Sequence, residues 1–309
     1  MSSLQEGQHV TSTLDVLSAL GFSATSEAFE LDPVEAHNSD MNLARIEAAA
    51  TAGDLEAVKD VFENAKTGSL GGTCTQTTKV SAGSALFLAV QHGWKDIVEY
   101  LLSEGMTVHA THIKVATNNR DTTVLELLFR HGWDINKPLH SGHPPALALA
   151  VEDPALVSWF LAHSADPNAR CVMDITPLSA AVESASLPTI QQLFDHGASV
   201  LRGQLMHYAV VRRLSDRLQI MEYLLSKHPS LSLSKVMYED EPYCFESKKY
   251  FGLGTPLHDA AASGHLDAVQ FLLAHGSDAS VKDSLGRLAI ERARQYKHDS
   301  VVLCLELPA

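Results

Sequence analysis

Histidine is the residue type in this sequence with the most evident capacity for chemistry, since 16 are present among 309 residues. Two pairs, His109–His112 and His140–His143, have the i, i+3 spacing that places two imidazoles on one face of a helix. A metal site needs at least one further ligand, and neither pair has an acidic residue or a cysteine at ligand spacing. Both pairs also lie in or beside expected turns. We therefore expect no metal and no other cofactor.

The four cysteines, at positions 74, 171, 244 and 304, are far apart and form no CxxC motif. This spacing argues against a zinc ribbon and against a redox dithiol, and it favours reduced thiols. The first residues lack the basic region of a signal peptide, and no apolar run approaches the ~20 residues that span a bilayer. We expect an intracellular protein without a membrane span, in the cytoplasm or the nucleus.

Recognised catalytic motifs are missing from the sequence. It contains no GxSxG, HExxH or P-loop, and no GxGxxG followed by an acidic residue. A nucleophile and its base can still meet in space from distant positions, so an enzyme is not ruled out. Nothing favours one, and we assign no catalytic residue. The formal net charge of −14 argues against nucleic acid as a partner, because duplex binding depends on Lys and Arg.

The elements that position any functional residue are set by an internal repeat. The stretch TPLHDAAASGHLDAVQFLLAHGSDAS begins at Thr255 and predicts two short helices. The first helix ends at Gly264. The second carries apolar residues at helical spacing over 266–273 and ends at Gly276, where glycine readily adopts the left-handed conformation.

The same pattern recurs along most of the chain. Further units occupy residues 85–105, 113–132, 145–164, 176–197 and 206–228, with an amino-terminal unit at 45–64 and a carboxy-terminal cap at 285–307. Because one such helix pair cannot bury its apolar face alone, neighbouring pairs must stack. Small residues stand where the first helices would touch: Ala89, Ala116, Ala181 and Ala260.

These units resemble the ankyrin repeat, which has a T-P-L-H-x-A signature and a period of about 33 residues. Thr176 and Thr255, each followed by Pro-Leu, carry the closest match. The resemblance covers roughly residues 41–307 and departs from the pattern at Arg120 and around Pro154. It implies an all-α fold, a helix-turn-helix repeat solenoid of about seven to eight units.

Two segments lie outside the repeat pattern near the amino terminus. Residues 1–40 contain several acidic residues and no Lys or Arg, which predicts a partly disordered acidic arm before a repeat domain at 41–309. Residues 66–84 are rich in Gly, Ser and Thr and predict a polar loop between the first two units.

An insertion at residues 231–254 is rich in aromatic residues. It contains Tyr238, Tyr243, Phe245, Tyr250 and Phe251, although aromatic residues make up only 6% of the chain. Two interpretations remain open. The aromatic side chains could anchor a partner, or they could fold the insertion back onto the repeats as a small separate core.

The family binds partners through turn tips and the ends of its first helices. The equivalent positions in this sequence are Gln91, His92, Asn118, Asn119, Glu183, Arg212 and Arg213. They form a polar, then acidic, then basic series that could select an elongated partner by charge order. We expect Arg212 and Arg213 to contribute most, because arginine is enriched at binding hot spots.

The resulting hypothesis is a monomeric, non-catalytic scaffold that binds a protein through its concave groove and its aromatic insertion. The alternative is an enzyme or small-molecule-binding protein with a pocket between the insertion 231–254 and the groove. Self-association is a third possibility.

Overall fold

The structure is a computed structural model that describes the backbone of residues 33–67 and 76–306 and the side chains of residues 43–64 and 83–306. Most of the predicted acidic arm lies outside the described residues, as does the middle of the predicted loop 66–84. Within the described ranges the fold is all-α and contains no strand.

Over residues 33–67 and 76–306 the helices follow one another in eight pairs. These are α2 (Pro33–Ala52) with α3 (Leu55–Thr67), α4 (Gln76–His92) with α5 (Lys95–Ser103), α6 (Ala110–Asn118) with α7 (Thr122–Arg130), η1 (Ala146–Leu149) with α8 (Pro154–Ala162), α9 (Pro177–Ser184) with α10 (Leu187–Asp195), α11 (Leu205–Val211) with α12 (Arg217–Lys227), α14 (Pro256–Ala262) with α15 (Leu266–Ala274), and α16 (Ala289–Gln295) with α17 (Asp299–Glu306). The insertion adds α13 (Pro242–Lys248) and η2 (Lys249–Phe251) between the sixth and seventh pairs.

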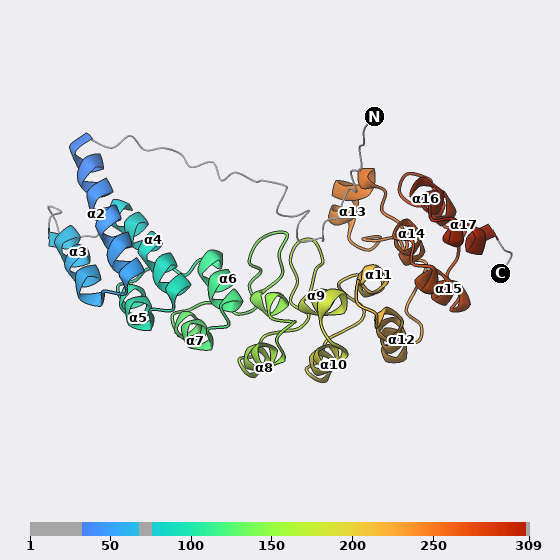
Figure 1. Ribbon diagram of the computed structural model, residues 1–309, viewed down its shortest axis with the longest axis horizontal. Coiled ribbons are helices and arrows are strands. Elements are labelled where there is room, and N and C mark those ends of the chain that lie inside the picture. Colours follow the sequence, from blue (N-terminus) through green and yellow to red (C-terminus); the bar gives the residue numbers. More distant parts are fainter. Residues whose placement is uncertain (1–32, 68–75, 307–309) are drawn as a thin grey trace, which may run out of the picture.

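The pairs stack into two rows of helices. The first helix of each pair contacts the first helices of its neighbours, as α9, α11 and α14 do, and second helices such as α12, α15 and α17 make the other row. The stack forms a shallow arc, and the first helices line its inner side (Figure 1). This arrangement confirms the repeat organisation expected from the sequence.

Local sequence explains where each helix begins and ends. Thr255 and His258 form a reciprocal capping pair at the start of α14, and Pro256 takes the first helical position, where no backbone N–H is required. Gly264 ends that helix with φ +70°. Arg120 stands where other units have this glycine, and it adopts the same left-handed conformation with φ +57°. The arginine therefore keeps the turn that glycine makes in the other units.

The core depends on small side chains between the first helices. Ala89, Ala116, Ala181 and Ala260 each have 0% of their surface exposed. Alanine at these contacts lets the backbones approach closely, so a larger side chain would overpack the stack. The predicted contact positions are therefore confirmed.

Three segments differ from the sequence-based expectations. Helix α2 begins at Pro33, so the last residues of the predicted acidic arm are helical. Helix α4 begins at Gln76, so residues 76–84 extend a helix and are not part of a loop. In the fourth pair the first helix is reduced to the four residues of η1, and residues 150–153 link it to α8.

Candidate functional site

A pocket opens on the inner side of the arc beside the shortened element η1. Its cavity volume is about 40 Å³, and it is open to solvent on one side. Its walls come from the loop before η1, from η1 itself and from the first helices α9 and α11. They include Leu139, Pro144, Leu149, Ile175 and Ala180, together with His143, Glu183 and Tyr208. The pocket is therefore mainly apolar.

The two ring-bearing polar residues of the pocket are uncharged near neutral pH. Burial lowers the pKa of His143, and the charges of Lys114 and His140 act in the same direction. Burial also raises the pKa of the Tyr208 phenol well above its ordinary value. The Tyr208 hydroxyl lies near the phenol of Tyr238.

This pocket is not where the sequence placed one. The alternative hypothesis expected it between the insertion 231–254 and the groove, whereas no residue of the insertion is among its lining residues. The departure from the repeat pattern around Pro154 was the available sequence signal, because it marks the unit whose first helix is short.

The insertion is held to the fifth pair on one side. Arg170, in the loop before α9, bonds to Glu241 and also to Asp174, the latter at 3.0 Å between Nη1 and Oδ1. The Cys244 thiol donates a hydrogen bond to the carbonyl of Val172 over 3.0 Å. Contacts that join residues 71 and 72 positions apart thus fold the insertion back over the loops of an earlier repeat.

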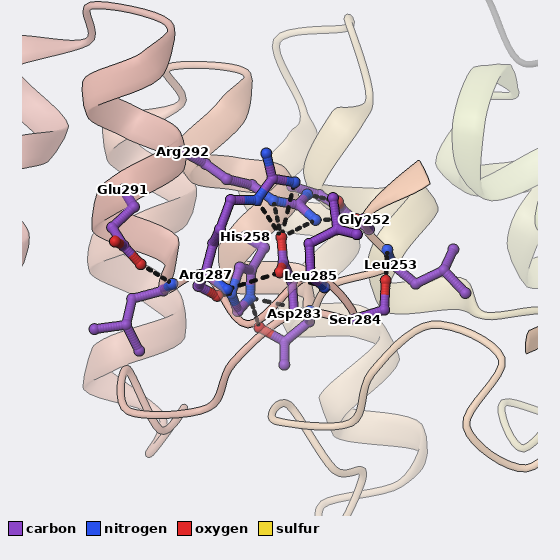
Figure 2. A network of polar contacts seen from close by, with 12 residues as sticks. Gly252, Leu253, His258, Asp283, Ser284, Leu285, Arg287, Glu291 and Arg292 are labelled. Atoms are coloured by element: carbon purple, nitrogen blue, oxygen red, sulfur yellow. Dashed lines mark hydrogen bonds and ion pairs between the residues drawn. The ribbon is translucent and has the colours of Figure 1, made fainter. Parts of the chain in front are cut away.

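The insertion is held to the last pair on its other side (Figure 2). The backbone N–H of Ser284 donates to the carbonyl of Leu253 over 2.8 Å, and the Leu253 N–H donates to the Ser284 hydroxyl over 2.7 Å. The Arg292 guanidinium donates to the carbonyl of Gly252. The insertion therefore bridges from the fifth pair to the eighth.

Asp283 is the centre of the polar network in Figure 2. Its buried carboxylate accepts from Arg287 Nε at 3.0 Å and from Arg292 Nη2 at 2.9 Å. Burial acts to raise the pKa of Asp283, but hydrogen bonds from Arg287 and Arg292 outweigh it and lower the pKa to about 2. His258 joins the network by its hydrogen bond to the Arg287 carbonyl, at 3.0 Å from Nε2.

The five aromatic residues of the insertion divide into two groups. Tyr238 is 3% exposed and forms a small core with Cys244 and Leu253, against which Phe245 packs. Tyr238 is therefore not available to a partner, and the small-core interpretation is correct for it. Three others point into solvent, with Tyr243 71%, Tyr250 75% and Phe251 81% exposed.

Arg212, expected to be a principal partner contact, is completely buried. Its guanidinium pairs with Asp216 and donates to the carbonyls of Val182 at 2.9 Å and Ala185 at 2.6 Å. The expectation was wrong because the end of α9 has unsatisfied carbonyls, and an arginine from the next unit satisfies them. Arg213, by contrast, is exposed.

The remaining predicted groove residues lie on the surface. Gln91, His92, Asn118 and Asn119 are exposed, and Asn119 Nδ2 donates to the Gln91 carbonyl over 2.9 Å. The structure thus brings the ends of α4 and α6 together. Glu183, at the end of α9, is partly buried in the pocket wall.

The histidine pairs have structural roles. The Nδ1 atom of His112 accepts a hydrogen bond from the His109 N–H over 3.1 Å at the start of α6. Burial, followed by the charge of His109, lowers the pKa of His112 to about 4. His140 and His143 form an isolated antiparallel bridge in the loop before η1. Across the described ranges, no three His, Cys, Asp or Glu side chains gather as a metal site would require.

Among the helices that the structure describes, none has both the length and the apolar character needed to cross a membrane.

Comparisons with known proteins agree with the repeat geometry. A family described as ankyrin repeats (many copies) matches residues 247–293. The probable E3 ubiquitin-protein ligase XBOS33 of Oryza sativa subsp. japonica is 38% identical over 74 residues, which is 24% of this chain and 14% of that protein. The E3 ubiquitin-protein ligase XBAT33 of Arabidopsis thaliana is 35% identical over 74 residues, 24% of this chain and 14% of the relative. The similarity thus spans about one seventh of each relative.

Stacked helix pairs with capped first helices define an all-α repeat protein. The TPLH unit at Thr255 lies inside the stretch that matches the family. The chain therefore contains ankyrin repeats, and residues 247–293 match the family. Repeats of this family indicate protein–protein interaction.

Proposed function

We propose that the chain is a non-catalytic scaffold that binds a protein partner through its groove and through the exposed aromatic residues of the insertion. The observation that carries this proposal is the exposure of Tyr243, Tyr250 and Phe251 at 71%, 75% and 81%. Large aromatic side chains are costly to leave in water and are enriched at binding hot spots.

The way in which the insertion is anchored supports this role. Its base is fixed by Arg170 on one side and by Arg292 on the other, and Tyr238 fills a small core beneath it. The exposed aromatic residues therefore lie on a segment that is already held in place, which lowers the conformational entropy lost when a partner binds.

The relatives are named as E3 ubiquitin-protein ligases, and the similar stretch is 74 residues long in each comparison. Since the similarity covers 14% of each relative, it supports a shared mode of protein recognition and not a shared reaction. We further propose that this chain acts as a monomer in the cytoplasm or nucleus. The unbridged thiols of Cys171, Cys244 and Cys304 fit that location.

The test is a comparison of partner binding between two matched variants of the full chain. Partners captured by the wild type are identified and purified, and their affinity is measured by calorimetry. The triple variant Tyr243→Ser/Tyr250→Ser/Phe251→Ser is expected to weaken binding at least tenfold, the range of hot-spot losses.

The control removes exposed apolar surface from a second helix, outside both the insertion and the row of first helices. Leu303, on α17, is 65% exposed. The variant Leu303→Ser should bind as the wild type does. Equal affinity of the triple variant and the wild type would show that the aromatic residues are not the contact.

A further inference from the structure

We infer that the pocket beside η1 receives one aliphatic side chain from an extended segment of the partner that lies along the groove. This inference rests on the proposed function and deepens it, because it assigns the chemistry that the groove recognises at one point.

The pocket exists because the fourth unit departs from the repeat. Its first helix has four residues in η1, whereas α9, α11 and α14 in the following units have seven or eight. The missing turn leaves a hollow between the loop before η1 and the helices α9 and α11, whose lining residues face it. The irregularity thus places an apolar hollow within the row of first helices.

The lining favours an aliphatic group over a charged or strongly polar one. Leu139, Pro144, Leu149 and Ile175 supply apolar walls. His143 is neutral at physiological pH because burial lowers its pKa. A negatively charged group would therefore lose hydration without gaining a cationic partner among the lining residues, whereas an aliphatic side chain is stabilised by burial against the apolar walls.

The surroundings favour a peptide as the source of that side chain. Polar atoms that would orient a small ligand from several directions are few in the wall, since His143, Glu183 and Tyr208 are its only residues with polar side chains. The pocket also lies in line with the exposed ends of α4 and α6, where Gln91 and Asn119 meet. An extended segment could contact both places.

The charge of this surface predicts which residues flank the aliphatic residue in the partner segment. The Glu183 carboxylate belongs to the pocket wall, and the chain carries a formal net charge of −14. A partner segment with Lys or Arg beside its aliphatic residue would be complementary to this surface. The predicted ligand is therefore a basic segment with one buried aliphatic side chain.

The experiment uses a displayed library of linear peptides selected on the full chain. Sequences that bind are expected to share an aliphatic residue with a basic neighbour. Replacing that aliphatic residue by Ser should weaken binding at least tenfold. Selected peptides without a shared aliphatic residue would overturn the inference.

A pocket-filling variant provides the second arm. Ala180 is a partly exposed residue of the wall, and Ala180→Phe should occupy the hollow and reduce peptide affinity at least tenfold. Ala262, near the end of α14, is the matched control, because Ala262→Phe adds the same bulk to a first helix outside the pocket. Its affinity should remain within twofold of the wild type.

The melting temperature shows whether each variant is folded, and Ala180→Ile replaces Ala180→Phe if the larger side chain unfolds the chain. Unchanged affinity in a folded pocket-filling variant would overturn the inference. If that variant also keeps the natural partner while the aromatic triple variant loses it, only the pocket assignment fails. If the selection yields no peptide and the pocket-filling variant binds the natural partner normally, the inference is likewise wrong.

Discussion

Arg212 and Asp216 form a two-pronged ion pair at the end of α11, with 2.7 Å between Nε and Oδ1 and 2.9 Å between Nη2 and Oδ2. Because the arginine also donates to two carbonyls at the end of α9, the pair connects the fifth and sixth units. The Arg212 side chain is 0% exposed. The hydrogen bonds from Arg212 lower the pKa of Asp216.

Replacing Arg212 should therefore affect stability and not recognition directly. The variant Arg212→Ala leaves Asp216 without its partner and two buried carbonyls without a donor, which should lower the free energy of unfolding by about 3–5 kcal/mol. Urea unfolding measures the change. Arg202→Ala, at an exposed arginine in the loop before α11, should change it by less than about 0.5 kcal/mol. Equal effects of the two substitutions would contradict the structural role.

His112 should make stability depend on pH in mildly acidic solution. Its folded pKa of about 4 lies below the ordinary 6.5, so between these values the unfolded chain binds a proton that the folded chain does not. The free energy of unfolding should therefore fall as the pH falls from 6.5 to 4, by up to about 3 kcal/mol from this residue.

The variant His112→Asn isolates that contribution, because its amide oxygen can still accept from the His109 N–H but does not titrate. Thermal or urea unfolding at several pH values should give a flatter profile for the variant than for the wild type. Parallel profiles would mean that His112 is protonated alike in both states.

Asp283 should hold the last pair and the insertion together. Asp283→Asn removes the charge that faces two arginines and should cost about 3–5 kcal/mol of unfolding free energy. It should also speed tryptic cleavage at Lys248 and Lys249, since Arg292 also binds the insertion through Gly252.

An exposed carboxylate in the same pair gives the control for Asp283. Asp299→Asn, at the start of α17, should cost less than about 1 kcal/mol and leave cleavage of the insertion unchanged. Slow cleavage in Asp283→Asn would show that the insertion is held without the network.

The wild-type Asp283 carboxylate also predicts acid sensitivity. Its folded pKa of about 2 lies below the ordinary 3.8. The stability that it contributes is present above pH 3.8 and is lost as the pH falls toward 2, by about 2 kcal/mol. Asp283→Asn should lack this step in an acid titration of unfolding. Its persistence in the variant would assign the step to other carboxyl groups.

Gly203 should tolerate a side chain less well than other glycines with the same backbone conformation. It has φ +79°, and a Cβ there would lie 2.1 Å from Ser179 Oγ and 2.7 Å from Thr176 Oγ1. Gly197 has φ +88° and open space around it. Gly197→Ala should cost about 1–2 kcal/mol from the backbone alone, and Gly203→Ala should cost about 1–3 kcal/mol more. Equal melting temperatures would contradict the close approach.

The repeat could be predicted from the sequence because its signals are local. Capping residues such as Thr255 and helix-ending residues such as Gly276 act through hydrogen bonds within a few positions of the chain. The stacking alanines, such as Ala260, follow from the same helical spacing. These features recur in each unit, so one regular unit identified the weaker ones.

The candidate site could be predicted only in part. The aromatic residues of the insertion made it a candidate binding segment. The sequence did not predict that Tyr238 is buried and Tyr243 is exposed. Both are tyrosines in the same segment. Their exposure differs because one side of the insertion packs on loops about 70 residues earlier in the chain, as the contact between Cys244 and Val172 shows.

The sequence by itself determined the unit, its period and the row of first helices, because these depend on neighbours along the chain. The tertiary structure decided which side chains reach solvent. The sequence placed Arg212 on the surface, but it is buried because it donates to carbonyls at the end of α9, 27 and 30 positions away. The pocket likewise results from three units meeting around the short η1. Burial depends on such distant contacts, and no local pattern encodes them.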